Sequence, residues 1–230
     1  MSEQSKVYLI GLLGHARAGK DTAFMGFRRK FNGDPAITVE QLAFADGIRS
    51  IGYALGIPYR YMRDPNLKQG KYPLFGSDGP TVREILQGIG KGLRTFVSND
   101  IFIKRVGAKV FDIYRIFKNN SCDSGEVADC IIVITDVRMK EEADWIKSLG
   151  GCIVRIDNPS LDLSDPMYQH DTEINIDSIK CDKCIVNNFS SAAEAEEKLG
   201  DLLHNAWYDL PCEMKLDPEV LAHIANIENK

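Results

Sequence analysis

The residues best suited to chemistry lie near the start of the chain, in the stretch Gly14-His15-Ala16-Arg17-Ala18-Gly19-Lys20-Asp21-Thr22. A glycine, four residues, a second glycine and a lysine have the spacing of a phosphate-binding loop. Glycines allow a tight turn whose backbone N–H groups approach phosphate oxygens, and the lysine adds a mobile positive charge. The residue after Lys20 is Asp21, where Ser or Thr is usual. The residues expected to bind a nucleotide cofactor, ATP, are Gly14, Ala16, Arg17, Ala18, Gly19, Lys20, Asp21 and Thr22.

The segments on both sides of this loop support the same interpretation. Residues 7–13 are short and apolar, as in a buried parallel strand, and residues 21–31 have apolar side chains at helical spacing. The helix directs its positive end toward the bound phosphates. A plain glycine turn before an ordinary helix is the alternative, and the order of strand, loop and helix disfavours it.

Asp136 ends a run of β-branched residues at 131–135 that predicts another strand. Ligands of open α/β sheets bind at the carboxyl ends of the strands, and an acid there can hold the magnesium ion of a phosphate-loop protein. Asp21 and Thr22 are the other expected Mg²⁺ ligands, because this ion prefers oxygen. The alternative role for Asp136 is capping of the next helix.

Several arginines are candidates for binding phosphate, because a guanidinium offers a planar fork of donors. Arg138 follows Asp136 closely, and with Lys20 it is expected to be catalytic in phosphoryl transfer. Arg49 and Arg94 are further candidates, although a single arginine can also be solvated or ion-paired.

Arg83 lies in the first turn of a helix that Thr81 and Glu84 open as a capping box. Gln87 is four residues further on, on the same face of that helix. A charged fork beside an amide could bind a phosphate and a base edge of a second substrate. An exposed polar stripe is the alternative.

The remaining pattern alternates strands with helices and predicts one α/β domain over residues 1–230, with a mostly parallel sheet covered on both faces. An inserted helical portion for substrate binding is expected at 56–128. Strands are expected at 37–42, 131–136, 152–156 and 184–186, and helices at 45–55, from 81, at 101–117, 139–149 and 191–207, with a further short helix in the tail from 211. Long loops are expected at 59–80 and 157–171.

Composition suits a soluble globular enzyme, with 230 residues, a hydrophobic fraction of 44% and a charged fraction of 27%. A net charge of −5 argues against a broad nucleic-acid footprint. No apolar run is long enough to span a membrane and no signal peptide precedes the first strand, so a cytoplasmic protein is expected. Cys181 and Cys184 form a C-x-x-C without a matching second pair, so zinc is not expected.

A series of short motifs in order resembles the phage deoxynucleoside monophosphate kinases of the T-even phage type. The motifs are Gly-Lys-Asp-Thr at 19–22, the segment 45–49, Arg83 with Gln87 and Gly90, Asp136-Val137-Arg138, the segment 142–156, His170-x-Thr172-Glu173 and Asn187-Asn188. Any one of them is weak, but the ordered set is specific. One departure is Asn158-Pro159, where the family tends to have Arg-Pro; Arg155 could substitute for that arginine over the phosphates.

This resemblance implies a phosphate-loop NTPase fold and transfer of the ATP γ-phosphoryl group to a deoxynucleoside monophosphate, with Mg²⁺. The substrate-binding residues that it implies are Arg49, Arg83, Gln87, Arg138 and Glu173. It also implies host cytoplasm as the location of a phage-encoded protein, and it leaves a homodimer open. Two alternatives stay open: a kinase that acts on hydroxymethylated pyrimidines in phage DNA, and a non-enzymatic nucleotide-binding protein.

Overall fold

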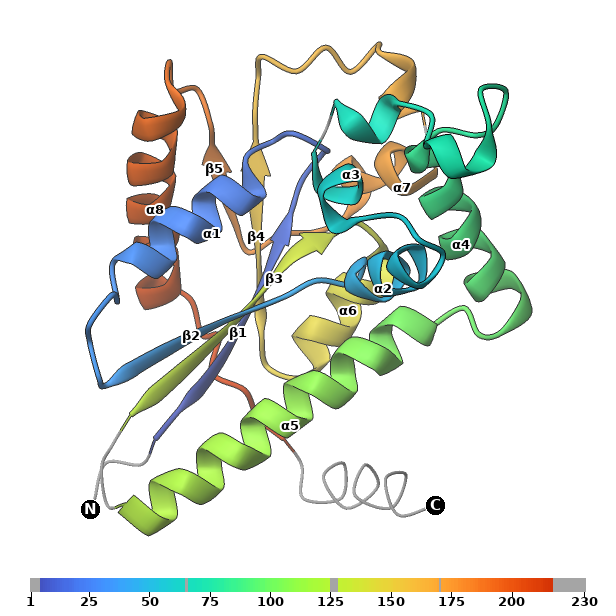
Figure 1. Cartoon of the computed structure of the whole chain (residues 1–230). Coiled ribbons are helices and arrows are strands. Elements are labelled where there is room, and N and C mark those ends of the chain that lie inside the picture. Colours follow the sequence, from blue (N-terminus) through green and yellow to red (C-terminus); the bar gives the residue numbers. More distant parts are fainter. Residues whose placement is uncertain (1–4, 65, 125–127, 170, 217–230) are drawn as a thin grey trace. The chain divides into compact units, whose positions relative to one another are not determined.

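The computed structural model describes residues 5–64, 66–124, 128–169 and 171–216 (Figure 1). The chain divides into two compact units, one made of residues 1–43 and 107–230 and the other of residues 44–106. The insertion predicted at 56–128 overlaps the second unit without coinciding with it. Among the described residues, no helix combines the length and the apolar character needed to cross a membrane.

The first unit is built on a five-stranded sheet in which every strand pairs in parallel with its neighbours. The strand order is β2 (Ile37–Leu42), β3 (Asp129–Val137), β1 (Val7–Leu13), β4 (Cys152–Asp157), β5 (Lys183–Val186). In the central strand, Ile10 lies opposite Val133 of β3 and Cys152 of β4, and all three are buried. These apolar runs fit strands covered on both faces, as the sequence predicted.

Helices cover both faces of this sheet (Figure 1). On one face, α1 (Lys20–Arg29) packs against α8 (Ala192–Asp209) so closely that a Cβ atom on Gly26 would lie 1.8 Å from the carbonyl oxygen of Glu196. On the other face lies α6 (Lys140–Ser148), whose Ile146 Cδ1 would be 2.7 Å from a Cβ atom on Gly11. A parallel sheet between helices, with a glycine loop between β1 and α1, is the phosphate-loop NTPase fold that the sequence predicted.

The crossover from β4 to β5 is less of a loop than the sequence predicted at 157–171. It contains three short helical segments, η3 (Pro166–Tyr168), α7 (Asp171–Ile174) and η4 (Ile176–Ser178). Buried Tyr168 and Ile176 anchor the segment, because each places a large apolar surface in the core. The helix predicted in the tail falls mostly on residues 217–230, which lie outside the described residues.

The second unit is helical, with a small core of Ile57, Met62 and Val82. Its elements are α2 (Asp46–Ala54), α3 (Tyr59–Arg63), η1 (Leu67–Gln69), η2 (Pro73–Phe75), α4 (Val82–Phe96) and the start of α5 (Ile101–Ser124). The predicted loop at 59–80 is therefore wrong, because three helical turns interrupt it. The predicted end of the helix at 117 is also wrong: α5 continues to Ser124, because no proline or glycine lies between Phe117 and Gly125.

The capping box that opens α4 is confirmed. The Oγ1 atom of Thr81 accepts the backbone N–H of Glu84 at 3.2 Å, and the Glu84 carboxylate accepts the backbone N–H of Thr81 at 2.7 Å. The Thr81 hydroxyl also lies 2.9 Å from the Glu84 carboxylate, and the bonds that this carboxylate accepts from the backbone N–H and the hydroxyl of Thr81 hold the pKa of Glu84 below its usual value. Two otherwise unpaired N–H groups of the helix end are satisfied in this way, so the first turn of α4 has a defined start.

Candidate active site

The loop between β1 and α1 needs glycine at two positions. Gly14 has φ 147° and Gly19 has φ 105°, both in the region that side chains rarely adopt. A Cβ atom on Gly14 would lie 2.4 Å from the carbonyl oxygen of Ile156, and one on Gly19 would lie 2.5 Å from Nδ2 of Asn187. Because α1 starts directly after Gly19, its free N–H groups face the loop and suit an anion.

Lys20 is the buried cation of this loop, with only 7% of its surface exposed. Its Nζ donates to the carbonyl oxygens of Gly14 and His15, both at 2.7 Å. Burial, and then the positive charge of Arg138, lower the pKa of Lys20 to about 7, although nearby carboxylates act in the opposite direction. The amine therefore exchanges its proton near neutral pH, and a bound phosphate would favour its charged form.

The carboxyl ends of β2 and β3 bring oxygen atoms to the same place. Gln41, the penultimate residue of β2, donates to the hydroxyl of Thr135 at 3.2 Å and to the carboxylate of Asp21 at 3.4 Å. Asp136 follows Thr135 and is close enough to Lys20 to oppose the lowering of its pKa. Of the predicted magnesium ligands, Asp21 and Asp136 are thus gathered around the loop lysine.

This set of atoms fits a magnesium ion bound together with phosphates. Within the described residues, no three His, Cys, Asp or Glu side chains are grouped as a metal site by themselves. Mg²⁺ is usually held by one or two carboxylates, substrate phosphates and water molecules, rather than by a cage of protein ligands. The donors offered by Asp21, Thr22 and Asp136 are all oxygen, so these residues suit the ion.

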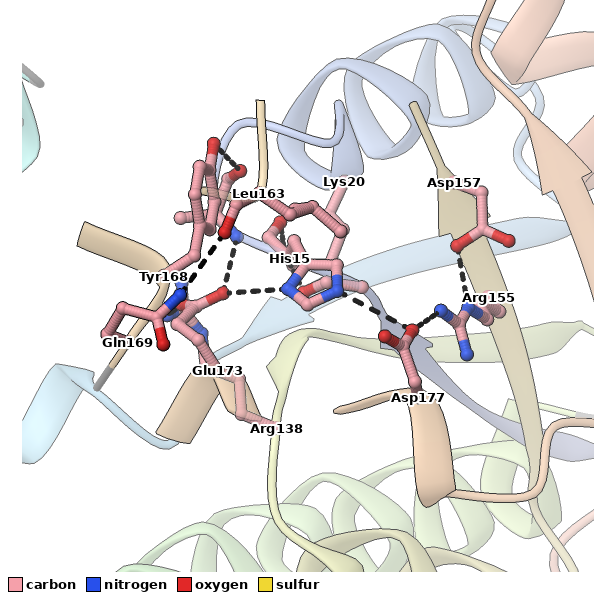
Figure 2. Close-up of polar contacts among 12 residues, drawn as sticks. His15, Lys20, Arg138, Arg155, Asp157, Leu163, Tyr168, Gln169, Glu173 and Asp177 are labelled. Atoms are coloured by element: carbon pink, nitrogen blue, oxygen red, sulfur yellow. Dashed lines mark hydrogen bonds and ion pairs between the residues drawn. The ribbon is translucent and has the colours of Figure 1, made fainter. Parts of the chain in front are cut away.

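A buried carboxylate connects the loop to Arg138 (Figure 2). Glu173, on α7, is 2% exposed. Its Oε2 accepts the backbone N–H of Ala16 at 3.0 Å and lies 3.3 Å from Nδ1 of His15, while its Oε1 pairs with Nη1 of Arg138. The structure therefore brings together Lys20, Arg138 and Glu173, which come from three distant parts of the sequence.

The β4–β5 crossover holds the loop through further contacts. The hydroxyl of Tyr168 donates to the carbonyl oxygen of Ala16 at 3.2 Å, and Nε2 of His15 lies 3.5 Å from the carboxylate of Asp177 (Figure 2). Arg155, the predicted substitute over the phosphates, is ion-paired with Asp157 and Asp177. His170 lies outside the described residues, and the side chains of its two successors are not described either.

The candidates for the second substrate lie in the unit 44–106. Arg83 and Gln87 are partly buried on α4, and Arg49 pairs with Asp46 on α2 at 2.7 Å. The guanidinium carbon of Arg94 lies 4.7 Å from the ring centre of Phe102. Basic side chains outnumber acidic ones in this unit by ten to five, although the whole chain has a net charge of −5. The unit therefore has the charge to attract an anion.

Sequence reasoning missed the roles of His15, Gln41 and Tyr168 and the hydrogen bond that Asn187 donates to the carbonyl oxygen of Ala18 at 2.9 Å. A signal existed for Gln41 and Asn187, because each is a polar residue at or just after the carboxyl end of a strand. No comparable signal existed for Tyr168, since only the packing of the crossover brings its hydroxyl to the loop.

The chain is similar to one protein from Acanthamoeba polyphaga mimivirus, named "Putative deoxynucleotide monophosphate kinase". The two are 31% identical over 194 residues, which cover 78% of this chain and 88% of the mimivirus protein. No protein-family model matches the chain.

Two solved structures are similar at low identity. The Mycobacterium tuberculosis APS kinase CysC, in complex with AMPPNP and APS, has a TM-score of 0.40 and 12% identity, with coverage of 86% of this chain and 98% of the other. The shikimate kinase from Aquifex aeolicus has a TM-score of 0.36 and 16% identity, with the same coverage of each chain.

Proposed function

Since this chain belongs to the deoxynucleotide monophosphate kinase family and is a nucleotide kinase, we propose that it transfers the γ-phosphoryl group of ATP to a deoxynucleoside monophosphate and forms the diphosphate. The observation that carries this proposal is the loop at 14–22, which combines two required glycines, a buried lysine and a helix start. The series of motifs along the chain, from Gly-Lys-Asp-Thr at 19–22 to Asn187-Asn188, favours the T-even phage type and a phage-encoded protein acting in the host cytoplasm.

The nucleotide donor is proposed to bind along the loop. The amine of Lys20 and the backbone N–H groups of the loop would bind its phosphates, apart from those of Ala16 and Ala18, which donate to Glu173 and to the carbonyl oxygen of His15. Asp136 would hold Mg²⁺, with Asp21 and Thr22 as further oxygen ligands. When bound, the ion would neutralise phosphate charge.

The acceptor is proposed to bind to the basic unit 44–106 through Arg49, Arg83 and Gln87. The excess of positive charge in that unit and the defined first turn of α4 support this assignment. Arg83 would bind the acceptor phosphate, and Gln87, one turn further along the helix, would contact the base.

In the proposed reaction, an oxygen of the acceptor phosphate forms a bond to the γ-phosphorus, and the bond from that phosphorus to the β–γ bridging oxygen breaks. ADP leaves with the electron pair of the broken bond. Lys20 and Arg138 stabilise the negative charge that develops on the transferred group. The protein contributes mainly by holding the two substrates in line.

A phosphorylation screen with labelled ATP tests this function. It offers the common deoxynucleoside monophosphates, their ribose counterparts, hydroxymethylated pyrimidine nucleotides, and DNA that contains modified bases. We expect magnesium-dependent labelling of a free deoxynucleotide. Labelling of DNA alone would identify DNA, instead of a free nucleotide, as the acceptor. ATP binding without transfer to any acceptor would favour the non-enzymatic alternative. The oligomeric state, for which a homodimer is one proposal, is measured in parallel by light scattering.

A further inference from the structure

We propose that Glu173 is a positioning residue that fixes Arg138 relative to the phosphate loop, rather than a contact to substrate. This inference rests on the proposed function, because it concerns the geometry of the same phosphoryl transfer. Its basis is one juxtaposition: a single buried carboxylate binds the loop with one oxygen and the arginine with the other (Figure 2).

The two oxygens of Glu173 have different partners. Oε2 accepts the backbone N–H of Ala16 at 3.0 Å and faces Nδ1 of His15 at 3.3 Å, and both partners belong to the loop. Oε1 accepts a hydrogen bond from Nη1 of Arg138, the residue that directly follows β3. A carboxylate group is rigid and planar, so a loop and a guanidinium bound to its two oxygens keep a fixed separation.

Glu173 and Arg138 differ in how much of each side chain is exposed, and this difference gives them different roles. The side chain of Glu173 is 3% exposed, whereas that of Arg138 is 31% exposed. A carboxylate with so little open surface, already bonded at both oxygens, has little capacity left for a substrate. The guanidinium has five N–H donors, and Glu173 takes one at Nη1, so others can face a transferring phosphoryl group.

Charge explains why an acid is needed at this place. Lys20 and Arg138 are close enough for Arg138 to lower the pKa of Lys20, and Glu173 opposes that effect. Without the carboxylate, the two cations would repel each other across a partly buried site. Glu173 therefore keeps both positive groups at the loop at the same time.

The carboxylate is itself held in place by the β4–β5 crossover. On one side of Glu173, the hydroxyl of Tyr168 bonds to the carbonyl oxygen of Ala16 at 3.2 Å. On the other side, Ile176 is fully buried, and Asp177 faces His15 at 3.5 Å. Contacts before and after α7 thus attach the same short segment to the loop, so Glu173 has little freedom to move away.

The first test compares Glu173→Gln with the wild type in steady-state kinetics. Glutamine keeps the length of the side chain but removes its charge, so it can still accept from Ala16 but no longer pairs ionically with Arg138. We expect kcat to fall roughly 100-fold, because a displacement of about 1 Å at a reacting group has that effect. We expect the KM for ATP to change by less than about threefold, since the loop and Lys20 remain.

The deciding test is chemical rescue of Arg138→Gly by added guanidinium ion at low, non-denaturing concentration. If Glu173 positions the guanidinium, the free ion should restore turnover at least about tenfold in Arg138→Gly and should not do so in the double variant Arg138→Gly/Glu173→Gln. Equal rescue in both variants would overturn the proposal. A purely structural role of Glu173 would lower turnover by the same factor with or without Arg138, and that result would also overturn it.

Asp162→Asn is the matched control, because Asp162 is an exposed acid of the same crossover whose carboxylate accepts the backbone N–H and the hydroxyl of Ser164 and has no bond to Ala16 or Arg138 among the described contacts. It should change kcat by less than about threefold, and rescue of Arg138→Gly should persist in its presence. A wild type that phosphorylates no nucleotide would contradict the proposed function instead. The same variants would then be compared by ATP hydrolysis, in which loss of rescue still supports the role of Glu173 and equal rescue still overturns it.

Discussion

The phosphate loop and helix α4 both carry candidate site residues, but they hold them in different ways. In the loop, Lys20 is buried and Ala16 is bonded on both sides by residues more than 150 positions away. On α4, Arg83 and Gln87 are placed by helix register and by a capping box that involves only neighbours in sequence. The donor site therefore depends on tertiary packing, whereas the acceptor candidates depend mainly on one helix.

Replacement of Lys20 by alanine should have the largest effect. We expect phosphoryl transfer to fall roughly 100- to 1000-fold while the fold is retained, because the bonds of the amine to described residues are to loop carbonyls and the amine would serve the phosphates. Turnover and circular dichroism of the purified variant check this. Lys30→Ala at the end of α1, which removes a surface ion pair with Asp201, should retain activity. Normal turnover of a folded Lys20→Ala protein would exclude the loop from the mechanism.

Asp136→Asn should raise the Mg²⁺ concentration needed for half-maximal activity by about 10- to 100-fold, the range seen when a partner of a bound metal is removed. The measurement is a magnesium titration of initial rates. Asp129→Asn is the matched control, because Asp129 begins the same strand and bonds to the backbone N–H of Lys6 at 3.0 Å instead. An identical titration for Asp136→Asn and the wild type would contradict the metal assignment.

Arg83→Ala should raise the acceptor KM, lower kcat, or both, by about tenfold in kcat/KM, because one charge-assisted bond is lost. The KM for ATP should change little, and Gln87→Ala should act more mildly and alter the preferred base. Lys91→Ala, exposed on the same helix, provides the control. If only the ATP KM rises, α4 serves the donor and the contrast between the two regions disappears.

Nucleotide binding should take up a proton above neutral pH. Free Lys20 has a pKa lowered to about 7, and phosphate should raise it, so the amine gains a proton on binding. Near pH 8 the uptake should approach roughly one proton per nucleotide, and well below pH 7 it should disappear because the free amine is already charged. Calorimetry in buffers of different ionisation heat measures it. Uptake that persists in Lys20→Met would assign the proton to another group.

Thr81→Ala should give the smallest effect, a loss of about 1 kcal/mol at the start of α4. The backbone N–H of Glu84 should exchange faster with solvent, since it donates to the Thr81 hydroxyl. Lowering the pH through the depressed pKa of Glu84 should also weaken the start of α4, because the ionised carboxylate accepts the Thr81 N–H and that stabilisation is absent once it is protonated. Thr95→Ala, near the other end of α4, should leave exchange at Glu84 unchanged.

Sequence by itself determined the sheet, the glycine loop and the capped helix, because each rests on local rules. Apolar runs specify buried strands, Gly14 and Gly19 specify a backbone that few residues adopt, and Thr81 with Glu84 specifies a helix start. The predicted ends of elements are wrong where local signals are weak. One example is the end of α5, where no proline or glycine lies between the predicted end at 117 and Gly125.

Only the tertiary structure decided how Glu173, Arg138 and the loop are joined. The sequence singled out Glu173 through a resemblance, but it could not indicate that the carboxylate is buried or that it divides its oxygens between Ala16 and Arg138. Such contacts join segments that lie 35 and 157 positions apart along the chain. Local spacing carries no information on pairs so distant, because the packing of the β4–β5 crossover over the sheet edge brings them together.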